Sequence, residues 1–99
     1  MPDTDAQLLD AFRRDRDERA FHTLAERHMG LIYGAALRRS GHRQLAEEAA
    51  QNVLALLVRK APDLAEEPAR LPGWLHRAAT LEVGNLLRIE ARHQRRKPL

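Results

Sequence analysis

The chain has 99 residues, of which 43% are apolar, 31% are charged and only 4% are aromatic. This length allows one hydrophobic core of modest size, and the composition favours a single all-α domain. Cysteine is absent, the longest apolar run, "VLALLV", is far shorter than the ~20 residues that cross a bilayer, and the N-terminus lacks a signal-peptide pattern. We therefore expect a cytoplasmic protein with no disulfide, no thiolate metal site and no membrane anchor.

Charge is distributed unevenly along the chain. Residues 1–69 carry 10 Lys and Arg residues against 12 Asp and Glu residues, whereas residues 70–99 carry 7 against 2. The first part therefore has a net charge of −2 and the second a net charge of +5. A basic C-terminal third favours an anionic partner such as nucleic acid. The alternative, a solvated basic helix end that complements its own dipole, stays open on charge alone.

The first two predicted helices cover residues 5–16 and 19–40. In the first, three apolar residues fall on one side: Leu8, Leu9 and Phe12. In the second, the residues expected to face the core recur at the i, i+3, i+4 and i+7 spacings of an amphipathic helix. They are Phe21, Leu24, His28, Leu31, Ile32 and Ala35. Gly41 follows two arginines at the end of this pattern, where we expect it to terminate the helix.

The third predicted helix covers residues 43–61 and contains the stretch "AEEAAQNVLALLVRK". At 100° per residue, one side is apolar and is expected to face the core: Ala46, Ala49, Ala50, Val53, Leu57 and, at its edge, Leu56. The opposite arc is mixed: Glu47, Glu48, Gln51, Asn52, Leu54, Ala55, Val58 and Arg59. From composition and periodicity alone we favour a helix buried on two sides of a bundle. The other interpretation is a face that is exposed in the isolated domain and covered later by a partner.

Proline governs the predicted connection to the last helix. The stretch "APDLAEEPARLP" contains three prolines, so we expect Pro62 to stop the third helix and residues 62–70 to form a loop. Pro72 suits the first turn of a fourth helix over residues 71–93. The end of the chain, residues 93–99, is interpreted as a frayed basic tail.

The fourth predicted helix carries a basic stripe. Arg77, Arg88 and Arg95 fall within ~20° of one another on a helical wheel, with Arg92 nearby and Gly84 on the same strip. Such a stripe can follow a phosphate backbone, and a glycine leaves room for a nucleic-acid strand to approach. From the pattern alone, however, a solvated basic face is the favoured interpretation.

Enzyme and metal-site interpretations find little support in the sequence. The five histidines are scattered without an HExxH pattern or an i, i+4 pair, and the chain has no cysteine and no glycine-rich phosphate loop. Ser40 is the only serine, and nothing around it suggests a nucleophile. Glu47 and Glu48 are adjacent and would point ~100° apart on a helix, which makes a poor acid–base pair. We expect no enzymatic activity, no metal and no cofactor.

Several stretches resemble region 2 of bacterial sigma factors, specifically of the extracytoplasmic-function group. The resemblance covers roughly residues 5–97 and rests on "AFHTLAERHMGLIYGAALRRSG", on "LAEEAAQNVLALLVRKAPDL" and on "LPGWLHRAA" followed by an arginine-rich end. It implies a compact four-helix domain that binds the coiled coil of the largest catalytic subunit of RNA polymerase core. It also implies that the last helix and the loop before it open the promoter and read the −10 element as single-stranded non-template DNA.

The resemblance assigns roles by position. The third predicted helix matches the family's polymerase-binding segment, with expected contacts at Glu47, Glu48, Gln51, Asn52, Leu54 and Val58. The last helix matches the DNA-contacting segment, with expected contacts at Trp74, Arg77, Arg88, Arg92, Arg95 and Arg96. With the resemblance, phosphate tracking becomes the favoured role of the basic stripe. For Trp74, packing as a core anchor is favoured over stacking on a base.

Two features depart from the family pattern. Many members of the group have Asn and Asp where this chain has Leu81 and Asn85, so the −10 sequence that is read stays open. The family's second domain, a helix-turn-helix that reads the −35 element, does not fit within 99 residues. An anti-sigma factor is a further partner that the resemblance admits. The alternative function, from another class, is a small helical protein-interaction module, an adaptor or regulator-binding fragment, whose basic tail is incidental.

Overall fold

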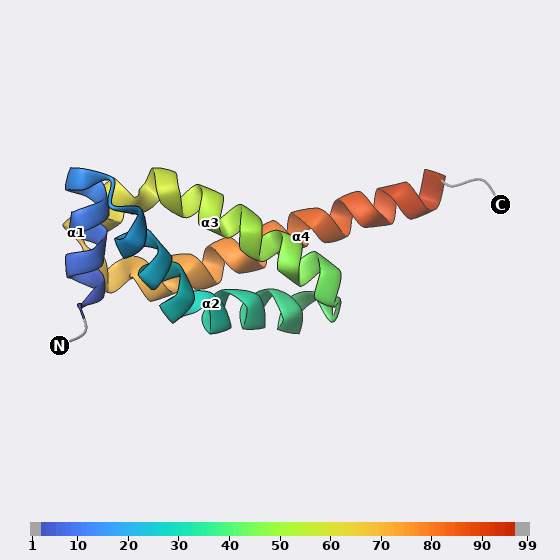
Figure 1. The fold of residues 1–99 in the computed structure, drawn as a ribbon. Helices are drawn as coiled ribbons and strands as arrows, with labels where there is room; N and C mark the ends of the chain where they lie inside the picture. The colour runs from blue at the N-terminus through green and yellow to red at the C-terminus, as the bar shows by residue number, and fades with distance from the viewer. Residues whose placement is uncertain (1–2, 97–99) are drawn as a thin grey trace.

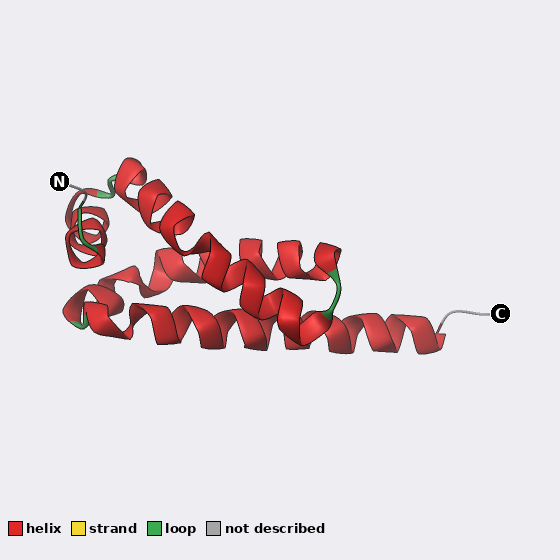
Figure 2. Cartoon of the chain, turned by 90° about the horizontal axis from the view of Figure 1, so that it is seen from below, coloured by secondary structure: helices red, strands yellow, loops and turns green. Residues whose placement is uncertain are grey.

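Four α-helices make up most of the chain in the computed structural model, which describes residues 3–96 (Figure 2). They are α1 (Asp5–Asp15), α2 (Glu18–Ser40), α3 (Arg43–Glu66) and α4 (Leu71–Arg96), and a short 3₁₀-helix, η1 (Pro68–Arg70), joins the last two. Within residues 3–96 there is no strand. The prediction of an all-α domain with four helices is confirmed.

The longer helices α2, α3 and α4 all pack against one another. Helix α1 lies across the end of this bundle where α3 ends and α4 begins, and it contacts α2, α3 and η1 (Figure 1). The last turns of α4 extend beyond the other end of the bundle (Figure 1). The C-terminal part of α4 therefore presents most of its circumference to solvent.

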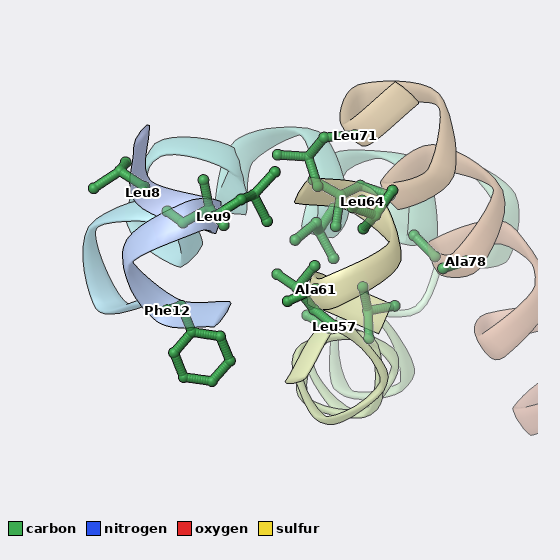
Figure 3. Close-up of a cluster of buried hydrophobic side chains, with 14 of the residues drawn as sticks. Leu8, Leu9, Phe12, Leu57, Ala61, Leu64, Leu71 and Ala78 are labelled. Carbon is green, nitrogen blue, oxygen red and sulfur yellow. The ribbon is translucent and has the colours of Figure 1, made fainter. Parts of the chain in front are cut away.

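The main hydrophobic core lies under α1 and draws on all four helices. Figure 3 shows side chains of α1, α3 and α4 that meet there: Leu8, Leu9, Phe12, Leu57, Ala61, Leu64, Leu71 and Ala78. Fully burying a leucine contributes about 1.5–3 kcal/mol, so these contacts dominate the stability of the fold. The predicted core face of α1 is confirmed, whereas on α2 three of the expected core residues are only partly buried: Phe21, His28 and Leu31.

Local capping chemistry sets the first helix boundaries. The Thr4 hydroxyl accepts a hydrogen bond from the Gln7 backbone N–H, and the Gln7 side chain accepts one from the Thr4 N–H, which forms a capping box. At the start of α2 the Asp17 carboxylate accepts hydrogen bonds from the backbone N–H groups of Arg19 and Ala20, without a reciprocal side-chain bond. At its other end α2 stops at Gly41, whose φ of 64° lets its N–H donate to Leu37 O at 2.7 Å. The predicted terminator is therefore confirmed.

The proline-based prediction for the end of α3 is wrong. Helix α3 continues through Pro62 to Glu66, and the expected loop at 62–70 is reduced to Glu67 and η1. The Pro62 ring faces solvent, while Ala61 and Leu64 on the other side of the helix are 1% and 0% exposed. An interior proline costs ~3 kcal/mol, and burying Leu64 and its neighbours offsets that cost. Tertiary burial therefore overrides the local stop signal.

The last helix is longer than the sequence predicted. It begins at Leu71 as expected but runs to Arg96, so residues 93–96 are helical rather than a frayed tail. The residues in this segment have good helix propensity, and the Gln94 side chain donates to Glu90 Oε1 at 3.1 Å across one turn. Residues 97–99 of the predicted tail lie outside the described residues. In the described part of the chain, none of the helices is both long enough and apolar enough for a membrane span.

The burial of Leu64 beyond Pro62 predicts how much the Leu64 side chain contributes to stability. We expect Leu64→Ala to lower the free energy of unfolding by about 2–5 kcal/mol, because it leaves a cavity in the core. The matched control is Leu81→Ala on α4, where the side chain is 66% exposed, and its effect should stay within about 0.5 kcal/mol. Urea unfolding followed by circular dichroism measures both. Equally small effects would mean that the chain after Pro62 does not pack into the core.

Candidate functional site

Helix α3 buries only one of its sides. The expected core face, Ala46, Ala49, Ala50, Val53 and Leu57, is buried, and Leu56 at its edge is partly buried. Of the predicted polymerase contacts, Glu47, Glu48 and Gln51 are exposed, and Asn52, Leu54 and Val58 are partly buried. Burial on two sides, which periodicity alone favoured, is therefore wrong. The mixed face is open and apolar enough to receive a partner.

The open face of α3 continues onto α2. Two hollows lie between these helices, one of about 450 Å³ and one of about 330 Å³, and Leu54 lines both. We call the combined area the α2–α3 surface. Its residues are Phe21, Ala25, Met29 and Tyr33 of α2 with Glu47, Gln51, Leu54 and Val58 of α3. The result is an apolar depression with a carboxylate and an amide on its α3 edge.

Helix α1 closes one end of the α2–α3 surface. The ring centroids of Phe12 and Phe21 lie 4.9 Å apart, and the Arg16 guanidinium lies 4.7 Å from the centroid of the Phe12 ring. Arg16 itself sits in the left-handed region with a φ of 52°, at the tight turn between α1 and α2. Glu18 and His22 line the same hollow. The larger hollow is therefore apolar at its base and charged at its rim.

The structure separates the predicted α3 contacts into two groups. Glu47, Gln51, Leu54 and Val58 line the hollows, whereas Glu48 and Asn52 line neither. At 100° per residue, the latter two are turned away from the α2 side of the helix.

Sequence analysis missed the contribution of α2 to this surface. It assigned Phe21 to the core and did not single out Met29 or Tyr33. The signal was present, because apolar residues recur every four positions at 21, 25, 29 and 33, beside the core strip. A ridge of this spacing forms one wall of a groove between packed helices.

The basic residues of α4 gather near its C-terminal end. Arg88, Arg92 and Arg95 are exposed and line a shared hollow of about 340 Å³. Arg77 is also exposed but lies three turns earlier, with its guanidinium beside Gly73 of its own helix. The structure therefore brings three of the predicted arginines together and leaves Arg77 apart. The side chain of Arg96, a further predicted contact, lies outside the described residues.

The other predicted DNA contact, Trp74, is partly buried and packs against the main core. Its interpretation as a core anchor agrees with this position, although part of the ring remains accessible. Two further residues of α4, Leu81 and Asn85, follow Trp74 on the outward side of the helix. Leu81 is 66% exposed, and Asn85 is exposed, with its Oδ1 accepting a hydrogen bond from Arg88 Nη2. The outward face between Trp74 and Arg88 thus presents Leu81 and Asn85 next to the exposed Arg77.

Gly84 does not offer the open approach that the sequence suggested. It is buried, and a Cβ at this position would lie 3.3 Å from Arg39 Nη2 and 4.0 Å from Arg88 Nη1. Helices α2 and α4 pack together here, so the last turn of α2 brings Arg39 over the glycine. The expectation that Gly84 leaves room for a nucleic-acid strand is therefore wrong. Arg39 is a basic residue of this region that the sequence pattern did not indicate.

Four arginines of α4 carry charges that no ion pair neutralises in the part of the chain that the structure describes. Among the described side chains, no carboxylate forms an ion pair with Arg77, Arg88, Arg92 or Arg95. Their positive charge is therefore available to an external anion. The described residues also contain no group of three or more acidic or histidine side chains placed to hold a metal ion.

The comparisons with known proteins give one match. The model of a family described as Sigma-70 region 2 matches residues 24–93. This span includes all of α3 and η1 and most of α2 and α4. No curated protein and no solved structure matches the chain.

Proposed function

The chain belongs to the Sigma-70 region 2 family, which acts in transcription initiation and is not a class of enzymes, and on this premise we propose how it works. The α2–α3 surface binds RNA polymerase core, at the coiled coil of the largest catalytic subunit. Helix α4 binds the non-template strand of the −10 promoter element and helps to melt it. Because polymerase works in the bacterial cytoplasm, this role also places the protein there.

The shape and composition of the α2–α3 surface support the proposal that it binds RNA polymerase core. Two hollows joined at Leu54 form an apolar depression between two helices, and this shape accepts a ridge of side chains from a third helix. Glu47 and Gln51 border the apolar part and supply polar groups at the rim. An apolar centre with a polar rim is the usual composition of a protein interface. An anti-sigma factor that covers this surface would compete with polymerase.

The DNA part of the proposal rests on the division of α4 into two outward zones. The three grouped arginines, which form no ion pair with a carboxylate among the described residues, suit phosphates, whose contacts position a strand without reading its sequence. The zone with Trp74, Leu81 and Asn85 suits bases, because apolar and amide groups contact base faces and edges. We include the extracytoplasmic-function subgroup in the proposal, on the sequence motifs alone. The alternative, an interaction module with an incidental basic tail, is set aside because the family match assigns residues 24–93 to a family that acts in transcription initiation. That match includes Arg77, Arg88 and Arg92 of α4 but ends before Arg95.

Polymerase binding can be tested at Gln51, which lines the hollow next to Leu54. We expect Gln51→Arg to weaken binding to purified polymerase core at least tenfold, since substitution of an interface hot spot costs ~2 kcal/mol or more. Glu48→Lys should have a smaller effect, because Glu48 is exposed outside the hollows. Titration of labelled domain with core measures the affinities.

The matched control is Gln94→Arg, the same substitution at an exposed site in the last turns of α4. It should leave core affinity unchanged, and melting temperatures should agree for all variants. Equal losses for Gln51→Arg and Gln94→Arg would contradict the assignment, as would a Gln51→Arg protein that fails only because it unfolds.

Phosphate contact by α4 predicts a specific salt dependence. Each neutralised phosphate contributes about −0.7 to the slope of log K against log salt for a single strand. Arg95→Ala should therefore flatten the slope by roughly 0.7 for a −10-like oligonucleotide, whereas Arg59→Ala on α3 removes the same charge and should leave it unchanged. Fluorescence anisotropy over a salt series gives both slopes. Identical slopes for the parent and Arg95→Ala proteins would refute the phosphate contact.

A further inference from the structure

We propose that α2 and α4 jointly form a phosphate-binding site over Gly84, in which Arg39 and Arg88 hold one phosphodiester group of the bound strand. This inference rests on the proposed function, because it assumes that α4 binds DNA. It goes further in assigning part of the binding to a second helix, through a residue that lies outside the basic C-terminal third of the sequence.

The geometry over Gly84 brings two guanidinium groups to one point. Arg39 Nη2 lies 3.3 Å and Arg88 Nη1 lies 4.0 Å from the position that a Cβ of Gly84 would occupy. An arginine N–H donates to a phosphate oxygen at about 2.8 Å, and a phosphate offers several such oxygens. One phosphate can therefore accept hydrogen bonds from both side chains. The end of α2 and the middle of α4 lie side by side at this point (Figure 1).

The positive charges of Arg39 and Arg88 favour binding of an external anion. In the described part of the chain, neither Arg39 nor Arg88 forms an ion pair with a carboxylate. Two positive groups this close repel each other, and a bound anion would turn that repulsion into attraction. Arg39 also occupies the last turn of α2, where the helix dipole favours a cation. The dipole thus offsets part of the cost of placing two arginines together before an anion arrives.

The lack of a side chain at Gly84 leaves room for the end of the Arg39 side chain to lie over α4. Glycine in a helix interior costs roughly 0.5–1 kcal/mol relative to alanine, yet here a Cβ would press on the Arg39 guanidinium. Other glycines of the bundle differ in this respect. Arg38 lies against Gly34 and Arg77 against Gly73, each within a single helix. Gly84 is the one described glycine that an arginine of another helix covers.

The proposed site adjoins the basic hollow of α4. Arg88 belongs to both, since it also lines the hollow with Arg92 and Arg95. A strand that runs along α4 would therefore meet the Arg39–Arg88 pair and then the remaining arginines. The α2 contribution places this pair on the helical bundle. Arg92 and Arg95 belong to the last turns of α4, which extend beyond the bundle (Figure 1).

The test is a double-mutant cycle on binding of a −10-like single strand at low salt, measured with the whole 99-residue chain. Arg39→Ala should weaken binding about tenfold, the typical effect of a lost charge-assisted hydrogen bond. Arg39→Gln, which keeps most of the side-chain stem, should cause the same loss with an unchanged melting temperature. The matched control is Arg38→Ala, which removes a neighbouring charge from the same helix turn and should change affinity less than twofold.

Coupling between the two arginines decides whether they share one phosphate. The Arg39→Ala/Arg88→Ala protein should lose clearly less affinity than the product of the two single losses, because the second substitution removes a contact that the first has already impaired. Losses that multiply would overturn the shared site. So would an Arg39→Ala protein that binds like Arg38→Ala.

A scrambled strand separates this inference from the proposed function. Equal binding of −10-like and scrambled strands, with the Arg39–Arg88 coupling present, supports the phosphate site and refutes promoter reading. A preference for the −10-like strand without coupling supports the function and refutes the site. A parent protein that binds neither strand at low salt overturns both.

Discussion

Burial of Leu64 and Leu71 where α3 passes into α4 is the constraint on which the rest of the fold depends. These two side chains are fully buried against α1, and only Glu67 and η1 separate the helices that carry them. Their burial keeps α3 helical beyond Pro62 and starts α4 in the core, so both helices leave the same point in fixed directions. The positions of the α3 outer face and of the α4 arginines follow from that arrangement. A flexible loop at this junction would leave the two surfaces free to move relative to each other.

Helix α2 serves both candidate surfaces. Near its middle, Met29 and Tyr33 form one wall of the α2–α3 surface, and at its end Arg39 covers Gly84 of α4. The two surfaces therefore share a rigid element rather than belonging to separate parts of the chain. In the proposed function, α2 therefore keeps the bound DNA strand at a defined position relative to the polymerase subunit to which the domain binds. Precise positioning of this kind is easier on packed helices than on loops.

Charge is used differently at the two ends of the molecule. Around α1 the arginines have partners: Arg13 pairs with Asp10 and with Glu66 at 3.2 Å, and Arg27 pairs with Asp5 at 2.9 Å. These exposed or partly exposed pairs contribute little each. Arg27–Asp5 joins α2 to α1 and Arg13–Glu66 joins α1 to α3, whereas Arg13–Asp10 lies within α1. The hydrogen bond from Arg13 and the nearby positive charges also keep the pKa of Asp10 below its ordinary value. Among the side chains that the structure describes, Arg77, Arg88, Arg92 and Arg95 of α4 form no ion pair with a carboxylate, which is the charge pattern of a surface that meets an anion.

The sequence by itself determined the all-α class, the presence of four helices, the core faces of α1 and α3, the stop at Gly41 and the basic character of α4. All of these depend on interactions within one helix or one turn, which periodicity and capping residues describe well. It also identified the mixed face of α3, but periodicity within that helix cannot tell burial on two sides from exposure on one. Only the tertiary structure decided that question, because the answer depends on where α2 and α4 stop covering α3. The same holds for helix continuation through Pro62, for the α2 wall at Met29 and Tyr33, and for Arg39 over Gly84. Each of these arises where two helices pack, and packing joins residues that no local pattern relates.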